Sequence, residues 1–328
     1  MIITLRAFSP LTYIGYAFPL KAIGGNNMKI LSLFDGISCG QQALKEAGVK
    51  VDTYYASEIE SSSIAITQFN HPNTIQLGDI TKITNEQLDT LGHIDMVIGG
   101  SPCQDLSGYK TDGKGLEGSK SCLFWHFVRI LKHIQPKYFL LENVESMKNE
   151  WRDLISSILG VQPIMIDSSL LTAQSRKRYY WCNFNTTQPA DTHVMLKDIV
   201  LNASEVDSKY WYDKDFTYNG DNNKIQCTLN IKGMDSIKRV YNLEGKAPTL
   251  TCDGDGGHRV KKVYQDGKCR KLTPLEYERL QALPDNYTQY GLVDGKVVKI
   301  SDSKRYSAIG NGWTVSVIAH LFSQISEF

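Results

Sequence analysis

The chain has 328 residues, of which 41% are hydrophobic and 22% charged, as expected for a globular protein with one sizeable core and a smaller lobe. The formal net charge of +1 gives no overall attraction to a polyanion, so a nucleic-acid site would need a local cluster of basic residues. Seven cysteines without CxxC spacing argue against a disulfide framework and a zinc site, and no apolar run is long enough to span a bilayer. We therefore expect a cytoplasmic protein that binds no metal and no membrane.

The first 27 residues differ in character from the rest. They are rich in aromatic residues and end in Gly-Gly-Asn-Asn, directly before Met28. They lack the basic start, long apolar middle and small-residue cleavage site of a secretory signal. We expect an extension ahead of an original start at Met28, or a disordered appendage.

From Met28 onward, short apolar runs alternate with amphipathic helical patterns. Strands are predicted at residues 29–34, 51–57, 94–98 and 138–141, and helices over about 39–48, 59–69 and 123–134. This alternation predicts an α/β fold with a mainly parallel, Rossmann-like sheet covered on both faces. Ligands of such sheets bind at the carboxyl ends of the strands.

The alternation fades at about residue 185. Residues 185–271 are rich in Asn, Asp, Gly and Lys and predict a separate, irregular lobe. A helix is expected to resume after Thr273, with Pro274 in its first turn and Glu276 completing a capping box. An apolar last helix is predicted over about 312–323.

Three acidic residues follow predicted strands. Asp35 lies in a turn with Gly36, where glycine allows a ligand to approach the backbone. Glu58 could accept hydrogen bonds from a ribose diol, and Asp79 could hold an adenine amino group. Many turns contain glycines, and single acids are usually surface residues. Together, however, the three suit an adenosine ligand without phosphates, because no phosphate-binding lysine motif is present.

Candidate catalytic residues follow two other strands. Cys103, fixed by Pro102, lies after an apolar strand and is well placed as a nucleophile, although most single cysteines are small buried residues. Glu142 ends another apolar strand, where its carboxyl could stay protonated and act as a hydrogen-bond donor or acid. Arg176 and Arg178 are two residues apart, hence on the same side of a strand.

A basic cluster lies between residues 258 and 271 and includes Arg259 and Lys261. Such a run is often only a solvated surface. It could equally hold nucleic-acid phosphates.

The ordered set of motifs resembles the cytosine-5 DNA methyltransferase family. After Phe34-x-Gly36 come Pro102-Cys103-Gln104, Glu142-Asn143-Val144 and Gln174-x-Arg176-x-Arg178. The segments at 272–285 and 309–312 resemble the family's ninth and tenth motifs. The resemblance covers the chain from Met28 to its end, apart from residues 185–271, and is nearest to small phage and bacterial enzymes and the animal de novo branch. Asp35 and Cys39 replace small residues that are usual in the first motif, and Lys120-Ser121 stands where many members carry Arg-Gly.

The resemblance implies a role for each motif. It implies a catalytic methyltransferase domain at 28–184 plus 272–328 and a target-recognition domain at 185–271. Its catalytic residues would be Cys103, Glu142, Arg176 and Arg178. S-adenosylmethionine would be bound by Phe34, Asp35, Gly36, Ile37, Glu58, Ile59, Asp79, Ile80, Pro102, Asn311 and Trp313. DNA would be bound by Gln104, Ser107, Lys120, Thr249, Arg259 and Lys261.

The implied reaction is methyl transfer to carbon 5 of a cytosine that is flipped out of duplex DNA, with a covalent Cys103 adduct and no metal. The short lobe suggests a short recognition sequence. A monomer in a bacterial or phage-infected cell is expected, with a cognate restriction endonuclease as a candidate partner.

Three alternatives remain open. RNA is a rival substrate, because one branch of this fold methylates tRNA. A catalytically dead relative could bind only DNA or a partner enzyme, although Cys103 and Glu142 are both present. An unrelated adenosine-binding oxidoreductase would need the phosphate-cradling G-x-G-x-x-G, which the turn after the first strand does not contain.

Overall fold

The computed structural model describes residues 27–101, 123–252 and 259–325. Pro102, Cys103, Gln104, Ser107 and Lys120, which the sequence assigned to the site, lie outside the described residues.

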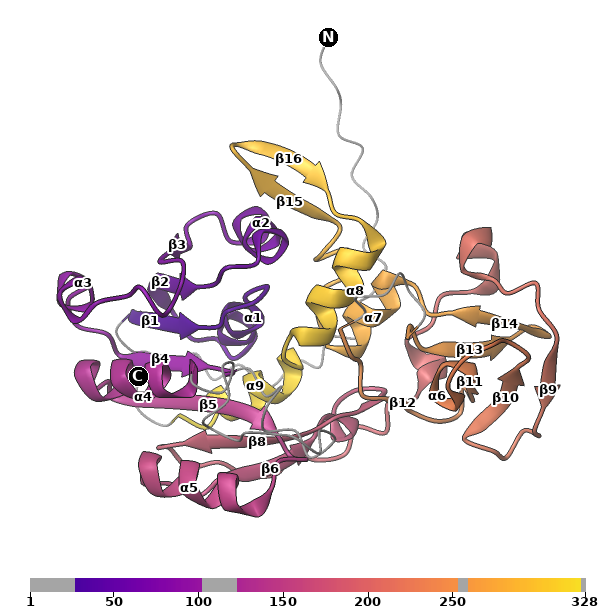
Figure 1. Cartoon of the computed structure of the whole chain (residues 1–328), viewed down its shortest axis with the longest axis horizontal. Helices are drawn as coiled ribbons and strands as arrows, with labels where there is room; N and C mark the ends of the chain where they lie inside the picture. The colour runs from indigo at the N-terminus through magenta and orange to yellow at the C-terminus, as the bar shows by residue number, and fades with distance from the viewer. Residues whose placement is uncertain (1–26, 102–122, 253–258, 326–328) are drawn as a thin grey trace, which may run out of the picture.

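A seven-stranded sheet forms the larger lobe (Figure 1). In spatial order its strands are β3 (Ile75–Gln76), β2 (Val51–Ser57), β1 (Met28–Leu33), β4 (Met96–Gly99), β5 (Tyr138–Val144), β8 (Lys177–Cys182) and β6 (Ile164–Asp167). Strand β8 runs antiparallel to β5 and β6, and the other neighbours are parallel. From β1 the chain adds β2 and β3 on one side and then returns to add β4 and β5 on the other, so the strand order reverses between β1 and β4. Ligands of open α/β sheets bind at such a switch point.

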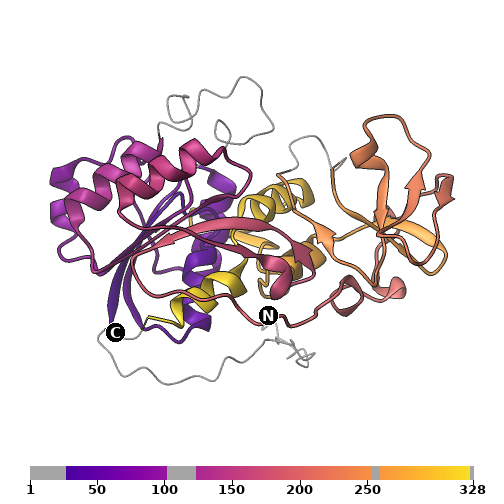
Figure 2. The ribbon, with the colours of Figure 1, turned by 90° about the horizontal axis from the view of Figure 1, so that it is seen from below.

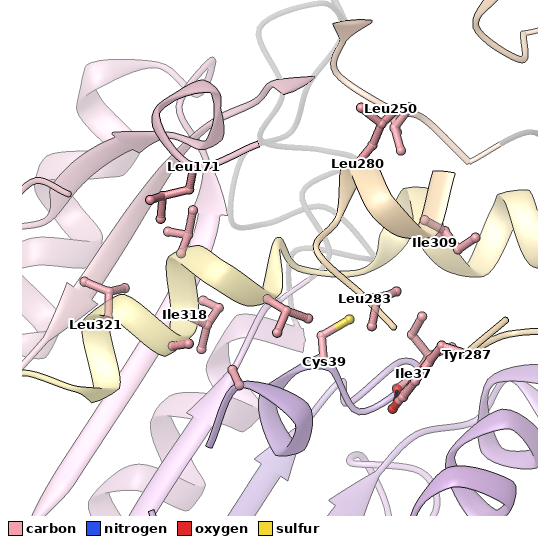
Figure 3. Close-up of a cluster of buried hydrophobic side chains, with 14 of the residues drawn as sticks. Ile37, Cys39, Leu171, Leu250, Leu280, Leu283, Tyr287, Ile309, Ile318 and Leu321 are labelled. Atoms are coloured by element: carbon pink, nitrogen blue, oxygen red, sulfur yellow. Dashed lines mark hydrogen bonds between the residues drawn. The ribbon is translucent and has the colours of Figure 1, made fainter. Parts of the chain in front are cut away.

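Helices cover both faces of this sheet, because apolar residues run continuously along the buried strands. On β1, Ile30 belongs to one buried cluster and Leu31 to the other, as expected when successive side chains point to opposite faces. One face packs against α1 (Cys39–Glu46) and α9 (Val315–Phe322). The other packs against α3 (Asn85–Thr90), α4 (Leu123–Ile134) and α5 (Asn149–Leu159). Figure 3 shows part of the first cluster, with Cys39 facing the C-terminal helices.

A second, five-stranded sheet forms the smaller lobe, at the far side of the molecule in Figures 1 and 2. Its strands are β14 (Lys268–Lys271), β13 (Lys262–Gln265), β11 (Arg239–Tyr241), β10 (Ile225–Leu229) and β9 (Phe216–Tyr218), with the short helix α6 (Asp235–Lys238) beside them. A small core of Cys227, Leu229, Val240 and Cys269 is separate from those of the larger lobe. The segment that the sequence predicted as irregular therefore contains an ordered sheet.

Two helices, α7 (Pro274–Leu280) and α8 (Asp302–Asn311), lie between the lobes (Figure 1). The predicted cap of α7 is confirmed: Thr273 accepts from the backbone of Glu276, and Glu276 accepts from the backbone of Thr273. Glu276 also pairs at 2.7 Å with Arg270 of the smaller lobe, and both side chains are fully buried. This ion pair anchors β14 to α7.

Shorter elements complete the described chain. The hairpin of β15 (Tyr290–Val293) and β16 (Lys296–Lys299) packs on α2 (Ser61–Asn70). A two-strand pairing joins β7 (Gln174–Ser175) to β12 (Ala247–Pro248). The 3-10 turns are η2 (Ser168–Leu170), η3 (Leu196–Asp198), η4 (Ala203–Glu205) and η5 (Ser208–Tyr210).

Within the described ranges, no helix combines the length and apolar character of a membrane span, and no group of three potential metal ligands is found.

Candidate active site

The turn after β1 has an unusual backbone. Phe34, Gly36 and Ser38 all lie in the left-handed region, with φ of 59°, 60° and 56°. Non-glycine residues rarely adopt this conformation, and it is concentrated at functional sites. Among the described residues, apart from Gly36 and its two chain neighbours, no atom lies within 4 Å of the position that a Cβ on Gly36 would occupy. The turn is therefore open to a ligand at Gly36.

Glu58, at the end of β2, fixes this turn. Its Oε2 accepts a hydrogen bond from the backbone N–H of Gly36 at 2.7 Å, and its Oε1 accepts from those of Ile59 and Glu60. A carboxylate has about four acceptor positions, so one remains for a ligand hydroxyl. Next to it, the Ile59 side chain is 73% exposed and offers an apolar surface at the same strand end.

Asp35 lies in the turn, but its carboxylate bonds to protein hydroxyls. It accepts from the hydroxyl of Ser38 and, at 2.8 Å, from that of Tyr54 on β2. Burial raises the pKa of Asp35 from 3.8 to about 6, against the lowering effect of the hydroxyls of Ser32, Ser38 and Tyr54, and the charge of Glu58 raises it slightly further. The carboxylate therefore supports the turn from within.

The other predicted cofactor residues fall into three groups. Asp79 is half-buried, and its Oδ1 accepts from the backbone and hydroxyl of Thr81, which lower its pKa. Ile37 and Ile80 are buried in the core, so a ligand could reach only their backbones. Asn311, the last residue of α8, is exposed, and Trp313, in the segment between α8 and α9, is half-buried.

Glu142 and Arg178 form an ion pair at the end of β5. The Nε of Arg178, on the antiparallel neighbour β8, lies 2.8 Å from Oε1 of Glu142. Their side chains are only 12% and 14% exposed, respectively. The indole N–H of Trp313 donates to Oε2 of Glu142 at 3.2 Å. Both oxygens of Glu142 are therefore held by N–H donors.

Asn143, beside Glu142, anchors the strand end that leads to Pro102. Its side-chain amide donates to the carbonyl and hydroxyl oxygens of Ser101 at 3.2 and 3.1 Å. Both residues are buried. This contact was not predictable from the sequence, because it depends on β4 and β5 being neighbours in the sheet.

Arg176 occupies a different environment from Arg178. It is 4% exposed and donates to the backbone carbonyls of Leu250, Gly310 and Gly312 at 3.0 to 3.2 Å. The structure thus brings Arg178 to Glu142, whereas these bonds tie Arg176 to three distant backbone segments. Strand alternation failed to predict this difference because β7 ends at Ser175 and β8 begins at Lys177.

The described DNA-binding candidates lie along the junction of the lobes. The hydroxyl of Thr249 donates to the carbonyl of Ser175 at 2.8 Å. Arg259 is exposed, and Lys261 is half-buried with its backbone N–H bonded to the Tyr277 hydroxyl.

The sequence is similar to those of known methyltransferases over almost its whole length. It is 27% identical to the type II methyltransferase M.HhaI of Haemophilus parahaemolyticus, across 92% of this chain and 94% of that one. It is 24% identical to the orphan methyltransferase M.SPRI of Bacillus phage SPR, across 91% and 97%.

Solved structures share the fold. The chain is similar to the Entamoeba histolytica methyltransferase EhMeth, with a TM-score of 0.68, 17% identity and coverage of 90% and 96%. It is also similar to the Dnmt2 methyltransferase of S. pombe, with a TM-score of 0.66, 17% identity and coverage of 90% and 98%. The family model for C-5 cytosine-specific DNA methylases matches residues 28–327. The chain belongs to the C-5 cytosine-specific DNA methylase family.

Proposed function

We propose that this chain transfers a methyl group from S-adenosylmethionine to carbon 5 of a cytosine flipped out of a short duplex DNA sequence. The observation that carries the proposal is the Glu142–Arg178 pair, one strand away from the strand end that leads to Cys103. Two largely buried charged groups near the end of β5, beside the end of β4, suit recognition of a polar planar base.

The strand ends of β1 and β2 fit S-adenosylmethionine. Gly36 leaves open space at a left-handed turn, Glu58 retains an acceptor position, and Ile59 offers an exposed apolar surface. The cofactor site would be completed by Phe34, Ile37, Asp79, Ile80, Pro102, Asn311 and Trp313. Asp35 would stabilise the turn through its hydrogen bonds to Ser38 and Tyr54. When bound, the cofactor supplies an activated methyl group.

Cys103 would act as the nucleophile. Its thiolate adds to carbon 6 of the cytosine, and the resulting enamine makes carbon 5 nucleophilic. Methyl transfer to carbon 5 would leave S-adenosylhomocysteine. Loss of the carbon-5 proton to water and expulsion of the thiolate would then restore the aromatic ring. A covalent cysteine adduct is characteristic of this family, and the assignment to Cys103 rests on the Pro102-Cys103-Gln104 motif.

Glu142 and Arg178 would hold the base while Cys103 adds. Glu142 would face ring nitrogen 3 and the exocyclic amine, and Arg178 the exocyclic oxygen. Arg176 would act on the base only through the backbone segments that it ties together.

The smaller lobe would read DNA. We propose residues 28–184 plus 272–328 as the catalytic domain and residues 185–271 as the target-recognition domain. The adjacent basic residues Arg259 and Lys261 would contact phosphates, with Thr249, Gln104, Ser107 and Lys120 nearer the base. The enzyme would work as a monomer, and a cognate restriction endonuclease is a candidate partner.

The decisive experiment combines labelled S-adenosylmethionine with mixed-sequence duplex DNA and identifies the products by nucleoside mass analysis. We expect 5-methyldeoxycytidine with the parent chain, none with Cys103→Ala, and a loss of at least about 100-fold with Glu142→Gln. Cys182→Ala is the matched control, since Cys182 lies at the opposite end of β8 from Arg178 and is not among the proposed site residues.

Methylation that survives Cys103→Ala would disprove the assigned nucleophile. If methylated product formed on RNA and none on DNA, the proposed substrate would be wrong and RNA would take its place.

A further inference from the structure

Trp313 contacts the glutamate of the proposed cytosine pocket, although the sequence assigned it to cofactor binding. Its indole N–H donates to Oε2 of Glu142, a residue 171 positions away. Arg178 binds the other oxygen, Oε1. A carboxylate held at one oxygen can still rotate about its terminal bond, whereas two donors on opposite oxygens fix its plane.

Two glycines make room for the indole. A Cβ on Gly40 would lie 3.3 Å from the ring of Trp313, and a Cβ on Gly100 would lie 2.8 Å from its Nε1 and 3.0 Å from Oε2 of Glu142. The indole therefore lies close to the backbone at the start of α1 and after β4. Backbone neighbours cannot rotate away as side chains can, so the position of the ring is well defined.

Hydrogen bonds fix the backbone on either side of Trp313. The carbonyl of Gly312 accepts from Arg176 and from Gln281, at 3.0 and 3.1 Å. The hydroxyl of Thr314 donates to Gln281 and accepts from Ser168. The indole is thus presented to Glu142 from an anchored segment.

We propose that Trp313 is a positioning residue for Glu142, with its indole N–H orienting the carboxylate toward the flipped cytosine. This rests on the proposed function. The same ring lies beside the start of α1, directly after the proposed cofactor turn. The side chain of Trp313 therefore contacts both the proposed cytosine pocket and the region of the proposed cofactor site.

Trp313→Phe tests the proposal, because phenylalanine keeps a six-membered aromatic ring and lacks the five-membered ring that carries the indole N–H. We expect kcat for DNA methylation to fall roughly tenfold, as for loss of one hydrogen bond to a charged group. The Kd for S-adenosylhomocysteine, measured by calorimetry, should change less than about twofold, because phenylalanine keeps an aromatic ring at the place where Trp313 would border the cofactor. Trp125→Phe is the matched control and should leave both values unchanged, since Trp125 lies on α4 and is 45% exposed.

A double-mutant cycle separates positioning from general damage. In a Glu142→Ala background, adding Trp313→Phe should cost less than about twofold in single-turnover rate, because the acceptor is already gone. A tenfold loss in that background, or weakened S-adenosylhomocysteine binding with unchanged kcat in Trp313→Phe, would overturn the proposal.

An NMR measurement tests the contact without activity. In protein labelled with ¹⁵N-tryptophan, the indole N–H signal that disappears in Trp313→Phe should move in Glu142→Ala, while the Trp125 signal stays in place. A signal that does not move would disprove the contact. If the signal moves but the parent chain methylates no DNA, the contact stands and the proposed function fails.

Discussion

Asp35 gives the turn after β1 a pH-dependent stability. Its folded pKa of about 6 exceeds the ordinary value of 3.8, so between these pH values the folded protein holds a proton that the unfolded chain has lost. Stability from this group is therefore complete below about pH 4 and falls as pH rises to about 6. Neighbouring Glu58, Tyr54 and Tyr287 share the environment, and Tyr54 and Tyr287 both have strongly raised pKa values.

Asp35→Asn should remove this dependence. The unfolding free energy of the variant minus that of the parent should increase by about 1 kcal/mol between pH 5 and pH 7, measured by urea denaturation. Asp52→Asn, at an exposed position on β2, should show no comparable trend. A pH-independent difference for Asp35→Asn would contradict this account.

The positions of single residues of the proposed site were predictable from the sequence where the strand pattern alone determines them. Glu58 and Glu142 were expected near strand ends from the apolar runs before them, and the structure has them there. The partners were not predictable. Arg176 bonds to Gly310 and Trp313 to Glu142 across 134 and 171 residues, and no local pattern encodes such pairs.

The buried ion pair between Arg270 and Glu276 governs how β14 joins α7. Arg270→Met would leave the carboxylate of Glu276 without its charged partner in a fully buried site. We expect the unfolding free energy to fall by about 3 to 5 kcal/mol, measured by urea denaturation.

An exposed ion pair provides the control. Lys197→Met breaks the pair with Glu244, whose side chains are 50% and 68% exposed, respectively, and should cost less than about 1 kcal/mol. Equal effects of the two variants would show that burial of the Arg270 pair does not matter.

Elements with strong local signals were predicted well. The cap of α7 was predicted because Thr273, Pro274 and Glu276 specify it within four residues. The β15–β16 hairpin was missed, although Asp294-Gly295, both at positive φ, is a typical hairpin turn. The second sheet was predicted as irregular because its strands of three to five residues are too short and polar for a clear alternation.

Ligand binding should stabilise the molecule as a whole. The proposed cofactor site draws on β1, β2 and the segment before α9, so its occupation opposes unfolding of the entire larger lobe. With S-adenosylhomocysteine at 100 times its Kd, we expect about 2.7 kcal/mol of added stability and a rise in Tm of a few degrees.

Glu58→Gln should abolish most of this rise in Tm at the same ligand concentration. Glu60→Gln should retain it, since Glu60 is exposed and pairs with Lys304 at the surface. The comparison uses each variant's own ligand-free Tm, so a loss of intrinsic stability does not affect the result. An undiminished rise in Tm for Glu58→Gln would show that Glu58 does not bind the cofactor.

The packing of α9 against α1 bears on how the protein is made. The last described helix packs against the first, in the same buried cluster as Ala43 and Leu44. The core of the larger lobe is therefore closed by two helices that are 276 residues apart in the chain (315 − 39). A nascent chain that has passed β8 still exposes the apolar side of α1 and must wait for the smaller lobe and α9 before its core is sealed. Synthesis order and folding order therefore differ, and partially translated chains should depend on chaperones and lack methylation activity.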